Sequence, residues 1–153
     1  MTTKVPNSKL EEFTAKACFK ASLGGADTAL PANSVQVIPF NTSAINVGNH
    51  FNPATYRFTP PAGVYRLNAR TFTSSAVDDT ESGTISIYKN GTAVATTAGY
   101  AFKTNGFINL AVSVLVTANG TDYFDARYFS FNLAGTRTLE GDPLYTSFEG
   151  EVL

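Results

Sequence analysis

The chain has 153 residues, a length suited to one domain, and only 15% of them are charged, where about 25% is usual for a soluble domain. Its net charge of −1 argues against a nucleic-acid partner, because phosphate binding needs a clustered excess of Lys and Arg. No apolar run approaches the ~20 residues of a membrane span, and residues 1–12 lack the apolar stretch of a signal peptide, so we expect neither membrane insertion nor export.

The first forty residues predict an arm, a strand, a loop and a short strand. Residues 1–12 are polar without a sustained period, which predicts an N-terminal arm ahead of one domain over residues 13–153. From Phe13 to Ala21 every second residue is apolar, the pattern of a half-buried strand. The Gly/Ala/Pro-rich stretch Leu23–Asn33 predicts a loop, and Val35–Phe40 a short strand at an edge.

The remainder of the chain predicts further strands separated by turns. Residues 64–75 alternate with Tyr65 on the inner face, and residues 107–117 alternate with Ile108 on the inner face. Asn-Gly pairs at positions 90–91 and 119–120 predict turns. The later segments are a strand at 122–133, a loop at Leu133–Asp142 and a last strand at 144–153. Strands at this spacing, with no helical period outside the arm, predict an all-β sandwich or barrel.

The order of aromatic and turn residues resembles the globular head of the complement C1q and tumour necrosis factor superfamily. The resemblance covers roughly residues 13–153, with two departures: the loop between Phe58 and Gly63 is one residue shorter, and Leu67 and Ala69 stand where the family prefers aromatic residues. The residues that carry it are Phe40, Asn46, Phe51, Phe58, Gly63, Tyr65, the segments 88–91 and 122–124, the closing Ser147-Phe148-Glu149-Gly150, and Leu153.

The resemblance implies an all-β, C1q/TNF-like jelly-roll β-sandwich of about ten strands that assembles as a tight homotrimer around a three-fold axis. It also implies a binding or structural head, which in such families is often carried on a collagen or coiled-coil stalk. The sequence has no Gly-X-Y repeat and no heptad pattern, so we expect a head without a stalk.

No constellation of residues predicts an enzyme. The only histidine, His50, lacks a nucleophile motif such as Gly-x-Ser-x-Gly, so a structural role is favoured over that of a general base. Cys18 alternates within the first strand without a nearby partner, which favours a structural thiol over a reactive one. Nothing has zinc-site spacing, and no Walker or dinucleotide glycine pattern is present.

The one local acidic cluster is a weak candidate for calcium. Asp78, Asp79 and Glu81 supply three carboxylates within four residues, fewer than the six or more oxygen ligands that calcium takes. A solvated loop is therefore favoured, and no cofactor is expected.

The strand at 122–133 predicts a trimer interface. If Phe124, Ala126 and Tyr128 point into the sandwich, its other face is mixed apolar and charged. An outward aromatic pair beside an Asp/Arg pair suggests a surface that a neighbouring subunit covers, with the charges satisfying each other across subunits. The predicted interface residues are Tyr123, Asp125, Arg127 and Phe129.

Two functions follow from these expectations. The first is a trimeric structural protein of a bacteriophage virion surface, a capsid decoration (cement) protein or a head fibre, assembled in the host cytoplasm and docked on other virion proteins through the arm. The alternative is a receptor- or carbohydrate-binding head of a tail fibre or bacterial surface adhesin, with recognition carried by the loops. Neither involves nucleic acid or a membrane.

Overall fold

A computed structural model of the chain describes residues 16–74, 82–100, 107–131 and 136–153. The predicted arm, the acidic residues Asp78, Asp79 and Glu81, and Phe13–Ala15 of the first predicted strand lie outside these residues. The described residues are strands, turns and irregular segments without helix. The strands are β1 (Cys18–Ser22), β2 (Thr28–Pro31), β3 (Gln36–Val37), β4 (Thr42–Val47), β5 (Phe51–Asn52), β6 (Arg57–Phe58), β7 (Gly63–Ser74), β8 (Ser82–Lys89), β9 (Thr92–Tyr100), β10 (Phe107–Ala118), β11 (Phe124–Phe131), β12 (Thr136–Leu139) and β13 (Ser147–Val152).

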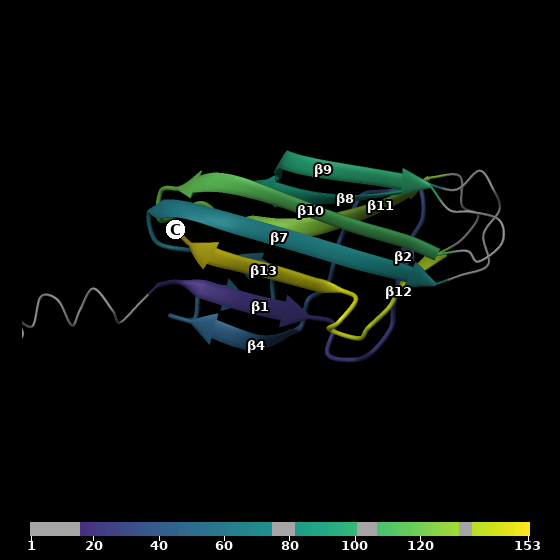
Figure 1. The fold of residues 1–153 in the computed structure, drawn as a ribbon, viewed down its shortest axis with the longest axis horizontal. Coiled ribbons are helices and arrows are strands. Elements are labelled where there is room, and N and C mark those ends of the chain that lie inside the picture. Colours follow the sequence, from purple (N-terminus) through teal and green to yellow (C-terminus); the bar gives the residue numbers. More distant parts are fainter. Residues whose placement is uncertain (1–15, 75–81, 101–106, 132–135) are drawn as a thin grey trace, which may run out of the picture.

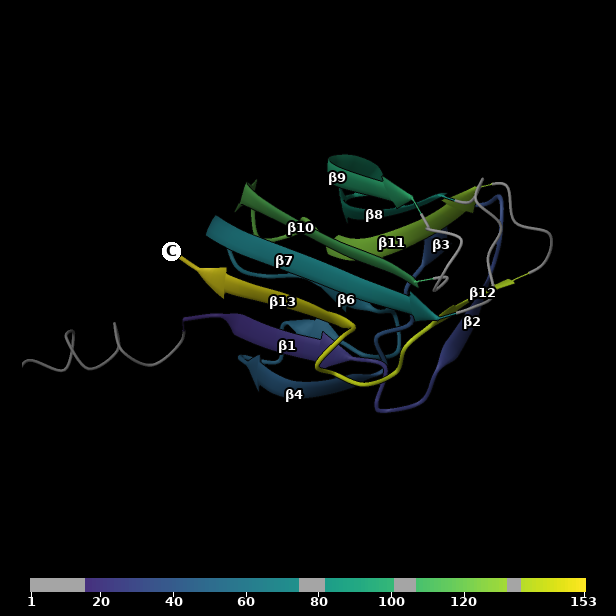
Figure 2. The ribbon, with the colours of Figure 1, turned by 45° about the vertical axis from the view of Figure 1, so that its right-hand side comes forward.

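Two antiparallel sheets face each other as the two layers of a sandwich (Figures 1 and 2). The larger sheet runs β2-β12-β7-β13-β1-β4, and β10 pairs with β7 along its whole length. The smaller sheet runs β5-β6-β11-β8-β9, with β3 pairing to β11. The architecture is the all-β jelly-roll sandwich that the sequence predicts.

Aromatic rings fill one end of the space between the sheets. The ring of Phe19 in β1 lies 5.0 Å from that of Phe51, 4.3 Å from that of Phe58 and 4.9 Å from that of Phe148, centroid to centroid. All four side chains are buried. Rings from four separate strands therefore pack into one core, which fixes the two sheets relative to each other.

The predicted strand faces are confirmed in the long strands. In β10 the side chains of Ile108, Leu110 and Val112 are buried while the residues between them are exposed. The Asn90-Gly91 turn joins β8 to β9 with φ values of 51° and 83°, the left-handed conformation that a two-residue hairpin of this type requires.

Two segments expected as loops contain strands, which corrects that expectation. β2 lies within Leu23–Asn33 and β12 within Leu133–Asp142, and the two strands pair with each other. Small residues and Gly obscured the strand pattern, yet Leu30 and Leu139 are buried in the core. Each strand is short, so its stability comes from pairing and from one buried leucine rather than from a local alternation.

Candidate interaction surfaces

The predicted interface residues lie on the smaller sheet, in or directly before β11. As expected, Phe124, Ala126 and Tyr128 point into the core. Tyr123, Arg127 and Phe129 are half-buried on the opposite side, but Asp125 is only 1% exposed. The carboxylate is therefore already covered within a single chain.

Asp125 and Arg127 form an ion pair within the strand. The Nε of Arg127 donates to one carboxylate oxygen of Asp125 at 2.6 Å, and its Nη2 donates to the other at 3.1 Å. The hydrogen bonds to Asp125 raise the pKa of Arg127, so this guanidinium remains charged. The guanidinium also lies over the ring of Tyr88, 4.1 Å from its centroid. Within one chain the two charges already satisfy each other, because residues two apart on a strand share a face and reach each other directly. That they also meet a neighbouring subunit stays a prediction.

Tyr123 is covered in a similar way, since the guanidinium of Arg57 lies 3.9 Å from the centroid of its ring. Phe129 instead contacts Phe131, with ring centroids 6.3 Å apart. Whether Tyr123 and Phe129 also meet a neighbouring subunit stays a prediction.

The carboxylate of Asp122, which the sequence did not identify as a candidate site, connects two turns by hydrogen bonds. Oδ1 of Asp122 accepts a hydrogen bond from the side chain of Asn90 (2.7 Å), and Oδ2 accepts one from the backbone N–H of Asn119 (3.0 Å) and lies 3.0 Å from Lys89 Nζ. These donors, the hydrogen bond from Lys89 first, lower the pKa of Asp122. Both carboxylate oxygens accept from the protein itself, so the cluster holds two turns together.

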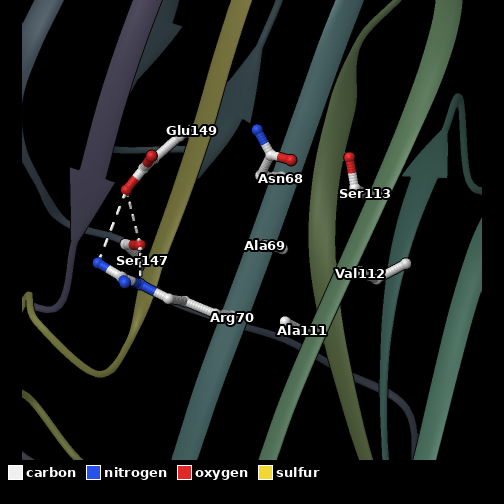
Figure 3. A pocket seen from close by; sticks show the side chains of 8 residues that line it. All are labelled: Asn68, Ala69, Arg70, Ala111, Val112, Ser113, Ser147 and Glu149. Atoms are coloured by element: carbon white, nitrogen blue, oxygen red, sulfur yellow. Dashed lines mark hydrogen bonds and ion pairs between the residues drawn. The ribbon is translucent and has the colours of Figure 1, made fainter.

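The open face of the larger sheet, the side turned away from the core, carries a shallow depression of about 290 Å³ (Figure 3). Small side chains of β10, Ala111 and Ser113, leave this space beside β7 and β13. It is lined by Asn68, Ala69, Arg70, Ala111, Val112, Ser113, Ser147 and Glu149.

The carboxylate of Glu149 contacts the polar and cationic side chains beside this depression. One of its carboxylate oxygens accepts a hydrogen bond from Ser147 Oγ at 3.0 Å and lies 3.3 Å from Lys20 Nζ and 3.8 Å from Arg70 Nη2. Arg70 also donates to Ser147 at 2.9 Å, as Figure 3 shows. The charges on this face are thus paired with each other within the chain. A neighbouring molecule can therefore cover this face without burying an unpaired charge.

Apolar side chains flank the depression on the same face. Leu115 in β10 is 59% exposed, and Val64 at the start of β7 and Leu153 after β13 are exposed near it. At the other end the ring of Phe72 lies 5.2 Å from that of Phe107 and 5.4 Å from that of Tyr145. The open face of the larger sheet thus exposes several apolar side chains, and a contiguous apolar surface is typical of an interaction site.

No catalytic or metal centre is assembled in the residues described. His50 lies in the turn region between β4 and β5, and its backbone carbonyl accepts from Thr59. Cys18 is half-buried in β1, a free thiol. In residues 16–74, 82–100, 107–131 and 136–153 no group of three or more His, Cys, Asp and Glu side chains is placed to hold a metal ion. The described part of the chain also contains no helix long and apolar enough to cross a membrane.

The sequence matches the C1q domain family over residues 19–133. Three solved structures superpose well while sharing little sequence, and so support the fold. The globular domain of the zebrafish complement 1qA protein is 16% identical, with a TM-score of 0.64 over 90% of this chain and 98% of that one. Murine APRIL at pH 5.0 is 10% identical, with a TM-score of 0.67 over 90% of this chain and 99% of that one. The Eiger TNF of S. frugiperda is 14% identical, with a TM-score of 0.63 over 91% of this chain and 92% of that one. No curated protein matches the sequence.

Proposed function

The chain belongs to the C1q domain family, and from that premise we propose that it is a non-enzymatic, homotrimeric structural protein of a bacteriophage virion surface, either a capsid decoration protein or a head fibre. Domains of this family typically form trimers. They generally serve as binding or structural modules rather than as enzymes.

The open face of the larger sheet is the observation that supports self-assembly most strongly. The exposed side chain of Leu115 and the aromatic group around Phe72 lie on either side of a depression made by small side chains. A second copy that covers this face would remove apolar surface from water at both ends. The pairing of Glu149 with Lys20 and Arg70 lowers the desolvation cost in between.

The β11 residues are a weaker choice for the contact between subunits. Asp125 and Arg127 already satisfy each other, and Tyr123 is covered by Arg57. Little uncompensated surface therefore remains there except Phe129 and its neighbour Phe131. Cross-linking through residues on the larger sheet, or through residues on β11, shows which of these two faces lies between the subunits.

The virion role is supported by the three-fold symmetry expected of the family and by the position of Ala17, close to the start of β1. A three-fold trimer matches the three-fold positions of an icosahedral capsid, where a decoration protein needs to seat three equal contacts. The described chain enters β1 beside the C-terminal strand, because Val152 N–H donates to Ala17 C=O at 3.1 Å. An arm that docks on other virion proteins from this end would leave the opposite end of the sandwich pointing outward.

Two measurements test the proposal. Light scattering of the purified protein should give three times the chain mass of 16.3 kDa at micromolar concentration. Electron microscopy of phage particles labelled with an antibody to the chain should place it on the capsid or on head fibres. A stable monomer would contradict the trimer, and a chain found only in the soluble fraction of infected cells would contradict the virion role while leaving the trimer intact.

A further inference from the structure

The open face of the smaller sheet contains two aromatic rings on either side of a hydroxyl group. Phe131 of β11 lies directly opposite Ser82 of β8, which in turn lies opposite Tyr100 of β9. Residues paired in this way point to the same face. Because neighbouring strands are spaced by about 4.8 Å, the backbones that carry the two rings are roughly 10 Å apart, with the serine between them.

The next row along the sheet has a ring on the β11 side only. Phe129 lies opposite Thr84, which lies opposite Ala98. The rings of Phe129 and Phe131 are 6.3 Å apart and inclined by 34°, so they form one continuous wall along β11. We call the six residues Ser82, Thr84, Ala98, Tyr100, Phe129 and Phe131 the aromatic trough. Between the rings lie Ser82, Thr84 and Ala98, which supply two hydroxyl groups and two methyl groups.

The trough is accessible and carries no charge. Tyr100 is 73% exposed and Phe131 is 50% exposed, while Ser82 and Thr84 are half-buried beneath them. The ion pair closest to it on β11, Asp125 with Arg127, is closed upon itself. A phosphate, sulfate or carboxylate ligand would therefore find no free counter-charge among these six residues.

We propose that the aromatic trough binds a neutral saccharide. A pyranose ring has apolar C–H faces and a rim of hydroxyl groups, so it needs apolar walls and uncharged hydrogen-bonding groups at once. The rings of Tyr100 and Phe131 supply the walls, and the hydroxyls of Ser82 and Thr84 supply donors and acceptors. A few polar groups placed among apolar ones are what small-molecule sites use to fix orientation.

The saccharide site goes beyond the structural role proposed above and does not depend on it. The trough is on the smaller sheet, whereas the proposed contact between subunits uses the open face of the larger sheet. A trimer assembled through the larger sheet would therefore present three troughs at once. Three equivalent sites would raise the avidity for a surface that displays many copies of the same glycan.

Binding to an array of immobilised glycans tests this inference. The full chain should retain at least one neutral hexose or N-acetylhexosamine oligosaccharide, and titration calorimetry should then give its dissociation constant. Tyr100→Ala and Phe131→Ala should each weaken that binding by about tenfold or more, because each removes one wall. Leu144→Ala, which truncates another exposed apolar residue, should bind like the parent.

Several results would overturn the proposal. One is an array without neutral glycans above background, and another is equal loss of binding in Leu144→Ala. Stronger binding to sialylated or sulfated glycans would show that charge decides recognition. Binding of phosphatidylcholine vesicles that Tyr100→Ala abolishes would assign the trough to lipid, and dissociation of the oligomer in Tyr100→Ala would assign it to a second copy. Circular dichroism of each variant separates these outcomes from misfolding.

Discussion

The guanidinium of Arg127 donates two hydrogen bonds, of 2.6 and 3.1 Å, to the carboxylate of Asp125, which lies two residues earlier in the same strand. The contact closes a charge pair beneath the surface of a sheet face that otherwise carries aromatic and hydroxyl side chains. Because both partners belong to one chain, the pair contributes to the stability of the subunit before any assembly takes place.

Asp125→Ala should therefore destabilise the folded subunit itself. The substitution leaves the guanidinium of Arg127 partly buried without its carboxylate, which costs 3–5 kcal/mol for a fully buried pair. We expect about 2–3 kcal/mol, since 21% of the Arg127 side chain is exposed and solvent screens it. Urea unfolding measures the loss. Glu151→Ala, which breaks the exposed pair with Arg66, is the control and should cost less than about 1 kcal/mol.

The lowered pKa of Asp122 predicts an acid-dependent part of the stability. Its folded-state pKa lies below the value of about 3.9 in an unfolded chain, so the stabilisation is present above pH ~3.9 and is lost as the pH falls through the folded pKa. Asp122→Asn removes the ionisable group. The variant should be less stable than the parent at pH 7, and the difference should shrink below pH ~3.9 in urea titrations. A difference that stays constant down to pH 2 would contradict this assignment.

Gly150 in β13 should not tolerate a side chain. A Cβ atom at this position would lie 2.5 Å from a ring carbon of Phe19 and 2.6 Å from a methyl carbon of Leu67, both buried. Gly150→Ala should therefore cost about 1–3 kcal/mol by overpacking. Thermal unfolding measures this loss of stability. A melting temperature equal to that of the parent would contradict the prediction and would mean that Phe19 and Leu67 can shift to make room for the methyl group.

Much of the fold could be predicted from the sequence because a long strand repeats its alternation of apolar and polar residues many times. The alternation around Ile108 fixed the faces of β10, and the Asn90-Gly91 pair located a hairpin turn, since few residues adopt its conformation. The short strands β2 and β12 could not be predicted in this way. Their stability comes from pairing with each other, a contact between segments more than a hundred residues apart.

The candidate site was harder to predict for a related reason. Alternation places Asp125 on the outward face, but it cannot show that Arg127 folds back onto it, so that Asp125 is buried and Arg127 is half-buried. The aromatic trough likewise requires the register of three strands: Phe131, Ser82 and Tyr100 become neighbours only once β11, β8 and β9 are aligned. Local patterns give the face of a residue, whereas the register decides its neighbours.

Leu115→Asp should dissociate the trimer while leaving each subunit folded. Leu115 is 59% exposed in the isolated chain, so a carboxylate there costs the subunit little, and surface changes of this kind are usually within about 0.5 kcal/mol. In a trimer that covers the larger sheet, the same carboxylate would be buried without a cation, since the described charges of this face are already paired with each other. Light scattering should thus report a monomer with a parental circular dichroism spectrum. Phe131→Asp provides the matched control, because it places the same charge at a similarly exposed apolar position on the smaller sheet. If Phe131→Asp dissociates the trimer and Leu115→Asp does not, the subunits meet through β11, as the sequence alone suggested, and the larger sheet is free for another partner.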